Sequence, residues 1–374
     1  MQVCRPSACR TLLLALLLSL PAGADQSRVV ELEVVGGIGV ATADYVGSGI
    51  EHAAEINAEL IIINMDTPGG LMKPMRGIVM DILGSDVPVA VYVTPAGARA
   101  DSAGTYILLS AHIAAMAPTT HLGAATPVPL VGGGGGEEDQ ESGQAPGMDQ
   151  KAINDAVSYI RGLAERHGRN ADWAEDAVLE AATLTATEAL EQNVIDFVAT
   201  NRDELLSQLD GLEVEVAGTK RQLSTADAEV QTFEPDWRIK LLTVISNPEI
   251  VLLLGLIGLY GLMYEGWNPG AIVPGVVGVI CLLLAAYALQ VIPVNYAGLG
   301  LIIIGVALIV AEAYAPSFGA LGIGGIAAFV FGAIIMFDSG VPGFGISYAF
   351  VIGIALLFAV LLIWLISYLL RLRR

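Results

Sequence analysis

Short apolar runs alternate with longer amphipathic stretches between residue 29 and about residue 212 of this 374-residue chain. The runs are rich in β-branched residues and include VVELEVV, ELIIINM, VPVAVYV and IAAMAP. The stretches between them, such as PMRGIVMDILGS, have the apolar spacing of helices. This alternation predicts an α/β domain with a mostly parallel sheet, in which sites are built from loops at the carboxyl ends of the strands.

The second half of this domain continues the pattern after an interruption. Residues 131–148 are rich in glycine and acids and have no apolar periodicity, which predicts a flexible, solvated loop. The segment from residue 151 has one apolar helical face, formed by Ile153, Val157, Ile160 and Leu163. A further helix follows, then a helix capped by Thr185 or Thr187, then a short strand. Residues 213–247 are interpreted as a small hairpin and a tether.

The last third of the chain predicts a membrane domain. Five apolar stretches, at about 248–264, 271–289, 296–313, 318–337 and 348–370, each approach the roughly 20 residues that a spanning helix needs. Glu265 and Glu312 each stand four residues before a proline, which is followed by a glycine-rich helix start. We interpret this echo as a parallel duplication of helical hairpins with closely packed glycines, rather than as a transport path.

The two ends of the chain predict its orientation. Residues 1–24 combine basic residues, a short apolar run and a small-x-small pattern, which predicts a cleaved secretory signal peptide. The α/β domain, expected at 25–212, then lies outside the cytoplasm. An odd number of crossings through residues 248–370 places the basic end, 371–374, in the cytoplasm, in agreement with the positive-inside rule. We therefore expect an inner-membrane protein of bacterial type with a periplasmic domain.

The net charge and the spacing of cysteine, histidine and glycine residues argue against nucleic-acid-binding, metal-binding and nucleotide-binding proteins. The net charge is −20 and no basic patch with interleaved aromatics occurs, so nucleic acid is not an expected partner. Cys4 and Cys9 lie in the expected signal peptide and Cys281 in an apolar stretch, which leaves no thiolate site. The histidines lack metal-ligand spacing, and the glycine run at 132–136 is not followed by Gly-Lys-Ser/Thr. We expect neither a metal nor a cofactor.

Two loops carry candidate chemistry. In NMDTPGGL, Gly69 and Gly70 let backbone amides turn toward a reacting oxygen, as an oxyanion hole requires. In GARADSAGTYILLSAH, Ser102 precedes Ala103 and an apolar helix, so it lies in the field of the helix N-terminus. Considered one at a time, the two loops are explained better as a plain turn and as an N-cap by Asp101 or Ser102.

Taken together, the motifs of this chain occur in a specific order. They are VATADYV, IIINMDTPGGLM, GARADSAGTYILLSAH, HLGAATPV and KAINDAVSYIRGLAERHGRN, followed by the five apolar stretches. With this arrangement the chain closely resembles the long-form NfeD family, which are membrane-bound serine peptidases with a ClpP/crotonase-like domain. The resemblance covers nearly all of the chain after residue 24. Long-form members usually continue into a small cytoplasmic OB-type domain, whose functions are not assigned to this chain.

The resemblance implies roles for individual residues. Ser102, in the Ser-Ala-Gly-Thr motif, is the expected nucleophile, and Lys151 is the expected general base. Gly70 and Ala103 are the expected oxyanion-hole residues. The expected substrate-binding residues are Gly69, Gly70 and Thr126. The implied partner is a stomatin-like (SPFH) membrane protein that supplies an apolar peptide segment, and a homo-oligomer is expected.

The surroundings of the expected base set conditions on this mechanism. A lysine acts as a base only when its amine is neutral, so we expect Lys151 to be desolvated in the assembled site. Asp149 and Asp155 are close in sequence, and a carboxylate paired with the amine would hold its proton in place. His121 is a rival base, as in related serine–histidine–aspartate enzymes, although its partner acid cannot be named from the sequence.

Asp101 departs from the family pattern, in which a small residue is expected at this position. A carboxylate next to the nucleophile opposes formation of the alkoxide unless its side chain points away.

Three functions are compared: a membrane-anchored serine endopeptidase, a non-catalytic scaffold for a stomatin-like protein, and an acyl-CoA enzyme of the crotonase type. The last is disfavoured because an exported domain is separated from cytoplasmic coenzyme A.

Overall fold

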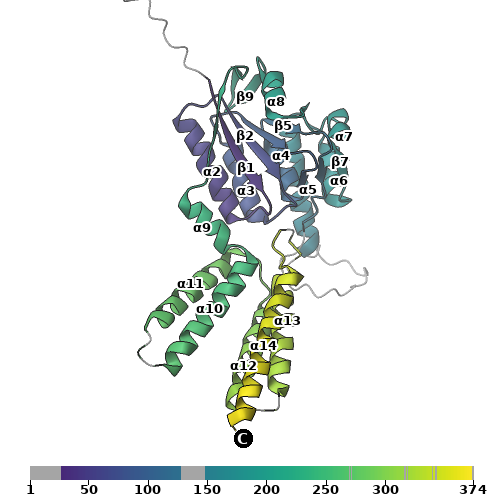
Figure 1. The fold of residues 1–374 in the computed structure, drawn as a ribbon. Helices are drawn as coiled ribbons and strands as arrows, with labels where there is room; N and C mark the ends of the chain where they lie inside the picture. The colour runs from purple at the N-terminus through teal and green to yellow at the C-terminus, as the bar shows by residue number, and fades with distance from the viewer. Residues whose placement is uncertain are drawn as a thin grey trace, which may run out of the picture.

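The computed structural model describes residues 27–127 and 148–372, apart from Pro269, Ala271, Pro316, Phe318, Ser339 and Pro342. An α/β domain lies at one end of the molecule and a set of long helices at the other, joined by α9 (Trp237–Ile245) (Figure 1). The expected signal peptide lies outside the described residues, and so does the expected glycine-rich loop up to residue 147.

Six parallel strands form the central sheet, in the order β11-β1-β2-β3-β5-β8. Their bounds are β1 Arg28–Val35, β2 Leu60–Asp66, β3 Val89–Val93, β5 Ile113–Met116, β8 Phe197–Val198 and β11 Glu229–Thr232. The predicted α/β domain is thereby confirmed. Strand β11 pairs with β1 from within the segment interpreted as a tether, so this segment also contributes to the sheet. The expected hairpin precedes it, as β9 (Glu213–Val216) and β10 (Thr219–Gln222).

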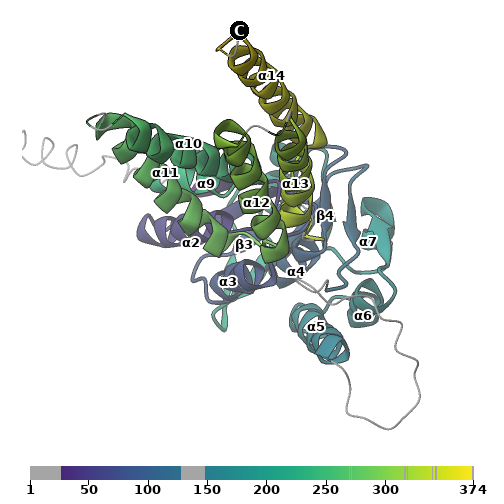
Figure 2. The same ribbon diagram turned by 90° about the horizontal axis from the view of Figure 1, so that it is seen from below.

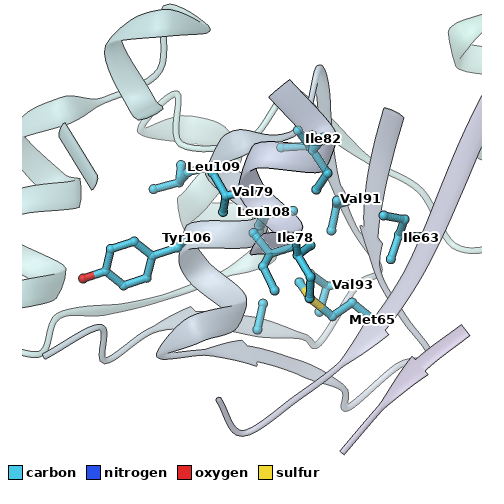
Figure 3. Close-up of a cluster of buried hydrophobic side chains, with 14 of the residues drawn as sticks. Ile63, Met65, Ile78, Val79, Ile82, Val91, Val93, Tyr106, Leu108 and Leu109 are labelled. Atoms are coloured by element: carbon cyan, nitrogen blue, oxygen red, sulfur yellow. The ribbon is translucent and has the colours of Figure 1, made fainter. Parts of the chain in front are cut away.

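Alternate residues of the buried strands face opposite sides of the sheet, because side chains along a strand have a period of two. Helices α2 (Val40–Glu55), α3 (Met72–Leu83) and α4 (Ala103–Ser110) cover one side. Figure 3 shows strand residues such as Ile63 and Val91 against Ile78 of α3 on this side. The other side packs against α8 (Arg202–Leu209) and the β9–β10 hairpin. Both faces are thus apolar, which explains the continuous hydrophobic runs of β2 and β3.

A second, smaller sheet has no counterpart in the sequence prediction. Strand β4 (Arg99–Asp101) pairs in parallel with β6 (His121–Gly123), and β6 pairs antiparallel with β7 (Thr183–Thr185). Helices α5 (Met148–Arg166), α6 (Ala171–Leu179) and α7 (Ala186–Glu191) complete this side of the domain. Thr185 rather than Thr187 caps α7, in a capping box with Glu188. The small sheet matters because β4 leads directly into Ser102.

Arg169 holds the far end of the helix that starts after Ser102. Its guanidinium is buried and donates hydrogen bonds to the carbonyls of Leu109 and Ala111, both at 2.9 Å. It also pairs with the Asp196 carboxylate at 2.7 Å. The last carbonyls of a helix have no partner within the helix, so this arginine satisfies them and fixes the position of α4.

All five expected apolar stretches are helices: α10 Pro248–Trp267, α11 Ile272–Val291, α12 Tyr296–Tyr314, α13 Ala320–Phe337 and α14 Tyr348–Leu372. Over the described residues, three of them, α10, α11 and α13, are long and apolar enough to cross a membrane. Helices α12 and α14 contain shorter described apolar stretches, Tyr296–Glu312 and Tyr348–Leu361. Membrane-crossing helices are therefore present, and five crossings remain a prediction.

The expected duplication is visible as two helical hairpins, with α10 beside α11 and α12 beside α13 (Figure 2). In each hairpin two glycines face each other so closely that an added Cβ would collide with the opposite backbone. A Cβ on Gly278 would lie 2.8 Å from the carbonyl oxygen of Gly258, and one on Gly325 would lie 2.6 Å from that of Gly305. These close approaches agree with the packing role assigned to the glycines.

The two glutamates of the sequence echo occupy corresponding places in the hairpins. Glu312 accepts hydrogen bonds from the amides of Ser317 and Gly319, each at 2.9 Å, at the start of α13. The Glu265 carboxylate lies directly against Gly275 in the first turn of α11. Each carboxylate thus lies at the N-terminus of the second helix of its hairpin, where the helix dipole stabilises negative charge.

Candidate active site

Ser102 occupies a strained turn between β4 and α4. Its backbone has φ 52° and ψ −114°, a region that non-glycine residues rarely adopt. The backbone is held there by a 2.8 Å hydrogen bond from its amide to the carbonyl of Gly123. Although Ser102 is the N-terminal residue before the helix, its side chain makes no capping hydrogen bond. The capping interpretation of this serine is therefore wrong, and its hydroxyl is left available.

Gly69 approaches Ser102 from the neighbouring loop. Gly69 has φ 116°, and a Cβ built on it would lie 2.7 Å from Cβ of Ser102 and 3.1 Å from its Oγ. Both the backbone conformation and the close contact require glycine at this position. The two loops that the sequence analysis singled out are thus adjacent in space.

Two backbone amides near this contact find no acceptor within the described part of the chain. The amide of Gly70 and the amide of Ala103, the first residue of α4, donate no hydrogen bond to any residue that the structure describes. The backbone groups on either side of the Gly70 amide are already hydrogen-bonded. The carbonyl of Gly69 accepts from the amide of Ile38, and the amide of Leu71 donates to the carbonyl of Ile38, both at 2.8 Å. Unpaired amides beside a serine hydroxyl are what stabilisation of an oxyanion requires.

Buried threonines fix the two loops relative to each other. The amide of Thr67 donates to the carbonyl of Arg99 at 2.8 Å, and its carbonyl accepts from the amide of Asp101 at 3.1 Å. The Thr105 hydroxyl lies 2.8 and 2.9 Å from the carbonyl oxygens of Ala100 and Gly123, so its one proton is shared between these two acceptors. Because both threonines are fully buried, these bonds are shielded from water and hold the turn around Ser102 in place.

Asp101 turns its side chain toward two basic groups of the small sheet. One carboxylate oxygen lies 3.6 Å from Nη1 of Arg99 and the other lies 3.5 Å from Nε2 of His121. An acid beside His121 was not predictable, because nothing local in the sequence indicates the β4–β6 pairing that brings Asp101 to it. Arg99 therefore partly neutralises the charge of the carboxylate that precedes Ser102 in the chain.

Replacing Asp101 with asparagine is expected to stabilise the protein at neutral pH. Burial raises the pKa of the Asp101 carboxyl, and the attractions of His121 and Arg99 only partly oppose that rise. A carboxyl pKa that is raised by folding means that ionising the group destabilises the folded state. This destabilisation is complete at pH values above the raised pKa and absent at pH values below the ordinary carboxyl pKa. We expect Asp101→Asn to raise the free energy of unfolding by up to about 1 kcal/mol at pH 7, and the gain to vanish below about pH 3.

The measurement is the unfolding midpoint of the purified full chain at both pH values. The control is Asp86→Asn, which removes a carboxylate from an exposed loop position. A variant that is less stable than the unchanged protein at pH 7 would show that the pairs with Arg99 and His121 outweigh the burial of Asp101.

Lys151 lies in the first turn of α5 and is exposed in the single chain. The desolvation expected for a base is therefore absent without substrate or a neighbouring subunit. Asp155, one turn further on, does not hold the amine, because its carboxylate is hydrogen-bonded to Arg76 of α3. Arg76 also stacks 4.5 Å above the centre of the Tyr159 ring. These contacts tie α5 to the helix that follows the Gly69–Gly70 loop.

The remaining predicted site residues have other partners. The Thr126 hydroxyl donates to the carbonyl of Val178 at 2.7 Å, so this side chain is used to attach its segment to α6. The side chain of Ser102 makes no hydrogen bond to Lys151, His121 or another described residue. Among the described residues, no group of three or more histidine, cysteine or acidic side chains has the arrangement of a metal site.

Comparison with known proteins identifies both parts of the chain. A family model described as the NfeD1b N-terminal domain matches residues 30–219, and one described as the NfeD integral membrane domain matches residues 249–368. The chain is 37% identical over 310 residues to the membrane-bound protease PH1510 of Pyrococcus horikoshii, which covers 82% of this chain and 68% of the relative. It is 31% identical over 336 residues to the membrane protein NfeD1b of Bacillus subtilis, with 85% and 70% covered.

Solved structures of a similar protease domain match the α/β part. One is the 1510-N membrane-bound stomatin-specific protease with a lysine replaced by alanine, in complex with a substrate peptide. It is 37% identical, with a TM-score of 0.52, and covers 59% of this chain and 98% of that structure. A mutant of the same protease with a serine replaced by alanine is also 37% identical, with a TM-score of 0.50 and coverage of 56% and 99%. The chain therefore belongs to the NfeD family and is a membrane-bound serine peptidase.

Proposed function

We propose that the protein is a membrane-anchored endopeptidase in which Ser102 and Lys151 form a catalytic dyad. The observation that carries the proposal is the strained, uncapped Ser102 beside two unpaired amides, those of Gly70 and Ala103. The proposed site draws its residues from the carboxyl ends of β2 and β4, from the N-terminus of α4 and, for Lys151, from the first turn of α5.

In the proposed reaction, Oγ of Ser102 attacks the carbonyl carbon of the peptide bond and its proton passes to Nζ of Lys151. The amides of Gly70 and Ala103 donate hydrogen bonds to the oxyanion that forms. When the carbon–nitrogen bond breaks, Lys151 returns the proton to the leaving amine. Water then attacks the acyl-enzyme, again with Lys151 as the base, and releases the second product.

Lys151 must be neutral for this chemistry, which requires that its exposed amine be removed from water. We propose that bound substrate and a second copy of the domain cover it, as the expected homo-oligomer would allow. The pairing of Asp155 with Arg76 supports the assignment, because it removes the nearest carboxylate on α5 from competition for the amine. His121 remains the rival base, with Asp101 as its acid.

The proposed substrate is an apolar peptide segment of a stomatin-like membrane protein, bound along Gly69, Gly70 and Thr126. Support comes from the 37% identity with a protease described as stomatin-specific and solved with a substrate peptide. Cleavage on the extracytoplasmic side, five membrane crossings and a cytoplasmic C-terminus belong to the same proposal. The domain boundaries expected from the sequence also remain part of it.

The test is labelling of the full chain with a fluorophosphonate, which reacts only with an activated serine. We expect one modified residue, located at Ser102 by mass spectrometry of the digested protein. Labelling should decrease when an apolar peptide is added as a competitor. A protein that stays unlabelled over a range of pH values and lipid conditions would favour the scaffold function and contradict the proposal.

A further inference from the structure

The loop between α13 and α14 reaches the α/β domain and packs against the turn that follows β1. Phe344, on this loop, is only 6% exposed. A Cβ built on Gly37 would lie 3.2 Å from Cε2 of the Phe344 ring, and one built on Gly39 would lie 3.2 Å from its Cζ. The ring therefore rests on two glycines that leave room for it, one on either side of Ile38.

Ile38 connects this contact to the candidate oxyanion hole. Its amide donates to the carbonyl of Gly69 and its carbonyl accepts from the amide of Leu71, both at 2.8 Å. Ile38 and Gly70 thus form a short parallel bridge, and Ile38 holds the residues on either side of Gly70. A Cβ on Gly70 would lie 2.2 Å from the carbonyl oxygen of Ile38, so the two backbones are in direct contact.

A second contact reaches the same loop without passing through Ile38. Leu71, the residue after Gly70, is buried in one apolar cluster with Val341 and Phe344 of the α13–α14 loop. In addition, a Cβ on Gly343 would lie 2.8 Å from Cα of Gly37 and 3.8 Å from Cγ of Pro68. The α13–α14 loop is therefore packed on both sides of the turn that presents the Gly70 amide.

We infer that Phe344 is a positioning residue through which the membrane helices hold the Gly70 amide in the orientation needed for catalysis. The inference rests on the proposed function, because it assigns a purpose to the amide that this function uses. Phe344 has no group that could react, so it acts through Ile38 and Leu71. The consequence is that full activity requires α13 and α14 to be correctly seated on the α/β domain.

The first test compares Phe344→Ala, Phe344→Leu and the unchanged full chain in detergent. Fluorophosphonate titration counts the active sites, and the rate of peptide cleavage is divided by that count. We expect kcat per active site to fall about 10- to 100-fold in Phe344→Ala, with KM changed much less, because only the oxyanion contact is disturbed. Phe344→Leu should recover part of the loss.

The matched control is Phe358→Ala, which removes the same side chain from α14 where it packs on Phe329, with ring centres 5.1 Å apart. This change perturbs the membrane helices away from the α/β domain and should leave kcat per active site within about twofold. A loss confined to the number of active sites in Phe344→Ala would indicate a general effect on folding and would contradict the inference.

A double-mutant cycle tests the contact itself. Gly39 has φ −125°, a backbone conformation that alanine adopts freely, so Gly39→Ala mainly adds a methyl group against Phe344. We expect this change to lower kcat per active site several-fold in the unchanged chain and to have no effect in Phe344→Ala. Any effect of alanine on the start of α2 is common to both backgrounds and cancels in the cycle.

The outcomes separate the inference from the function on which it rests. A chain whose Ser102 is not labelled overturns the proposed function, and the inference with it. A labelled chain in which Phe344→Ala keeps its kcat, or in which the two changes are additive, overturns the inference alone. A faster Phe344→Ala also overturns it, because that result would mean that the loop obstructs the site.

Discussion

Ser102→Ala is expected to lose at least about 10⁴-fold in the rate of peptide cleavage, because the proposed mechanism forms the acyl-enzyme on Oγ of Ser102. Fluorophosphonate labelling should disappear in the same variant. Cleavage is measured with an apolar peptide and the purified full chain. Secondary structure and the unfolding midpoint should stay close to those of the unchanged protein, since the Ser102 side chain makes no hydrogen bond to a described residue.

A second variant keeps this prediction testable if alanine disturbs the turn. Ser102→Gly also lacks the hydroxyl, but glycine adopts φ 52° and ψ −114° with less strain. We expect it to be as inactive as Ser102→Ala and more stable by about 1 kcal/mol. Ser158→Ala, on the exposed face of α5, is the control and should remain active. Retained cleavage in both Ser102 variants would rule out Ser102 as the nucleophile.

Lys151→Ala is expected to lower kcat by about 10³-fold, within the range typical for removal of a general base. The same loss is expected for Lys151→Arg, because a guanidinium stays protonated and cannot accept the proton of Ser102. The rate of fluorophosphonate labelling should fall in parallel, since it also depends on activation of the hydroxyl. Both rates are measured on the full chain with saturating peptide or reagent.

Lys220→Ala provides the matched control for the base. Lys220 lies on the exposed β9–β10 hairpin, where it pairs with Glu213 at 3.0 Å, so its removal should leave kcat unchanged. If Lys151→Ala keeps more than a tenth of the activity, the base is another residue. His121→Ala then becomes the decisive variant, because His121 lies 3.5 Å from an acid, Asp101.

Local patterns predicted the elements of the fold well. The apolar runs of β1, β2, β3 and β5 and the helical spacing of α5 come from the 2.0- and 3.6-residue periods of strands and helices, which depend only on neighbouring residues. The five C-terminal helices follow from their length and composition. The β4–β6–β7 sheet was not predicted, because its strands have three residues each and pair across long sequence separations.

The candidate site, like the fold, was only partly predictable from the sequence. Gly69, Gly70 and Ser102 were chosen from motifs, but each motif alone favoured a turn or a cap. The capping hypothesis for Ser102 failed because the tertiary structure holds its backbone in a strained conformation, in which its side chain makes no capping hydrogen bond. The concern that Asp155 would hold the proton on Lys151 was also unfounded, because Arg76 of another helix takes that carboxylate.

By itself, the sequence determined the main strands of the central sheet, the longer helices and the apolar stretches of the C-terminal third, since these depend on periodicity and apolar length. It also identified the two loops of the candidate site, through glycines placed next to strand ends. Only the tertiary structure decided that Gly69 touches Ser102, that Asp101 faces Arg99 and His121, and that Phe344 rests on Gly37 and Gly39. Apart from the pair Asp101–Arg99 within β4, these contacts join residues far apart in the chain, so they are set by packing of the whole molecule and leave no local pattern.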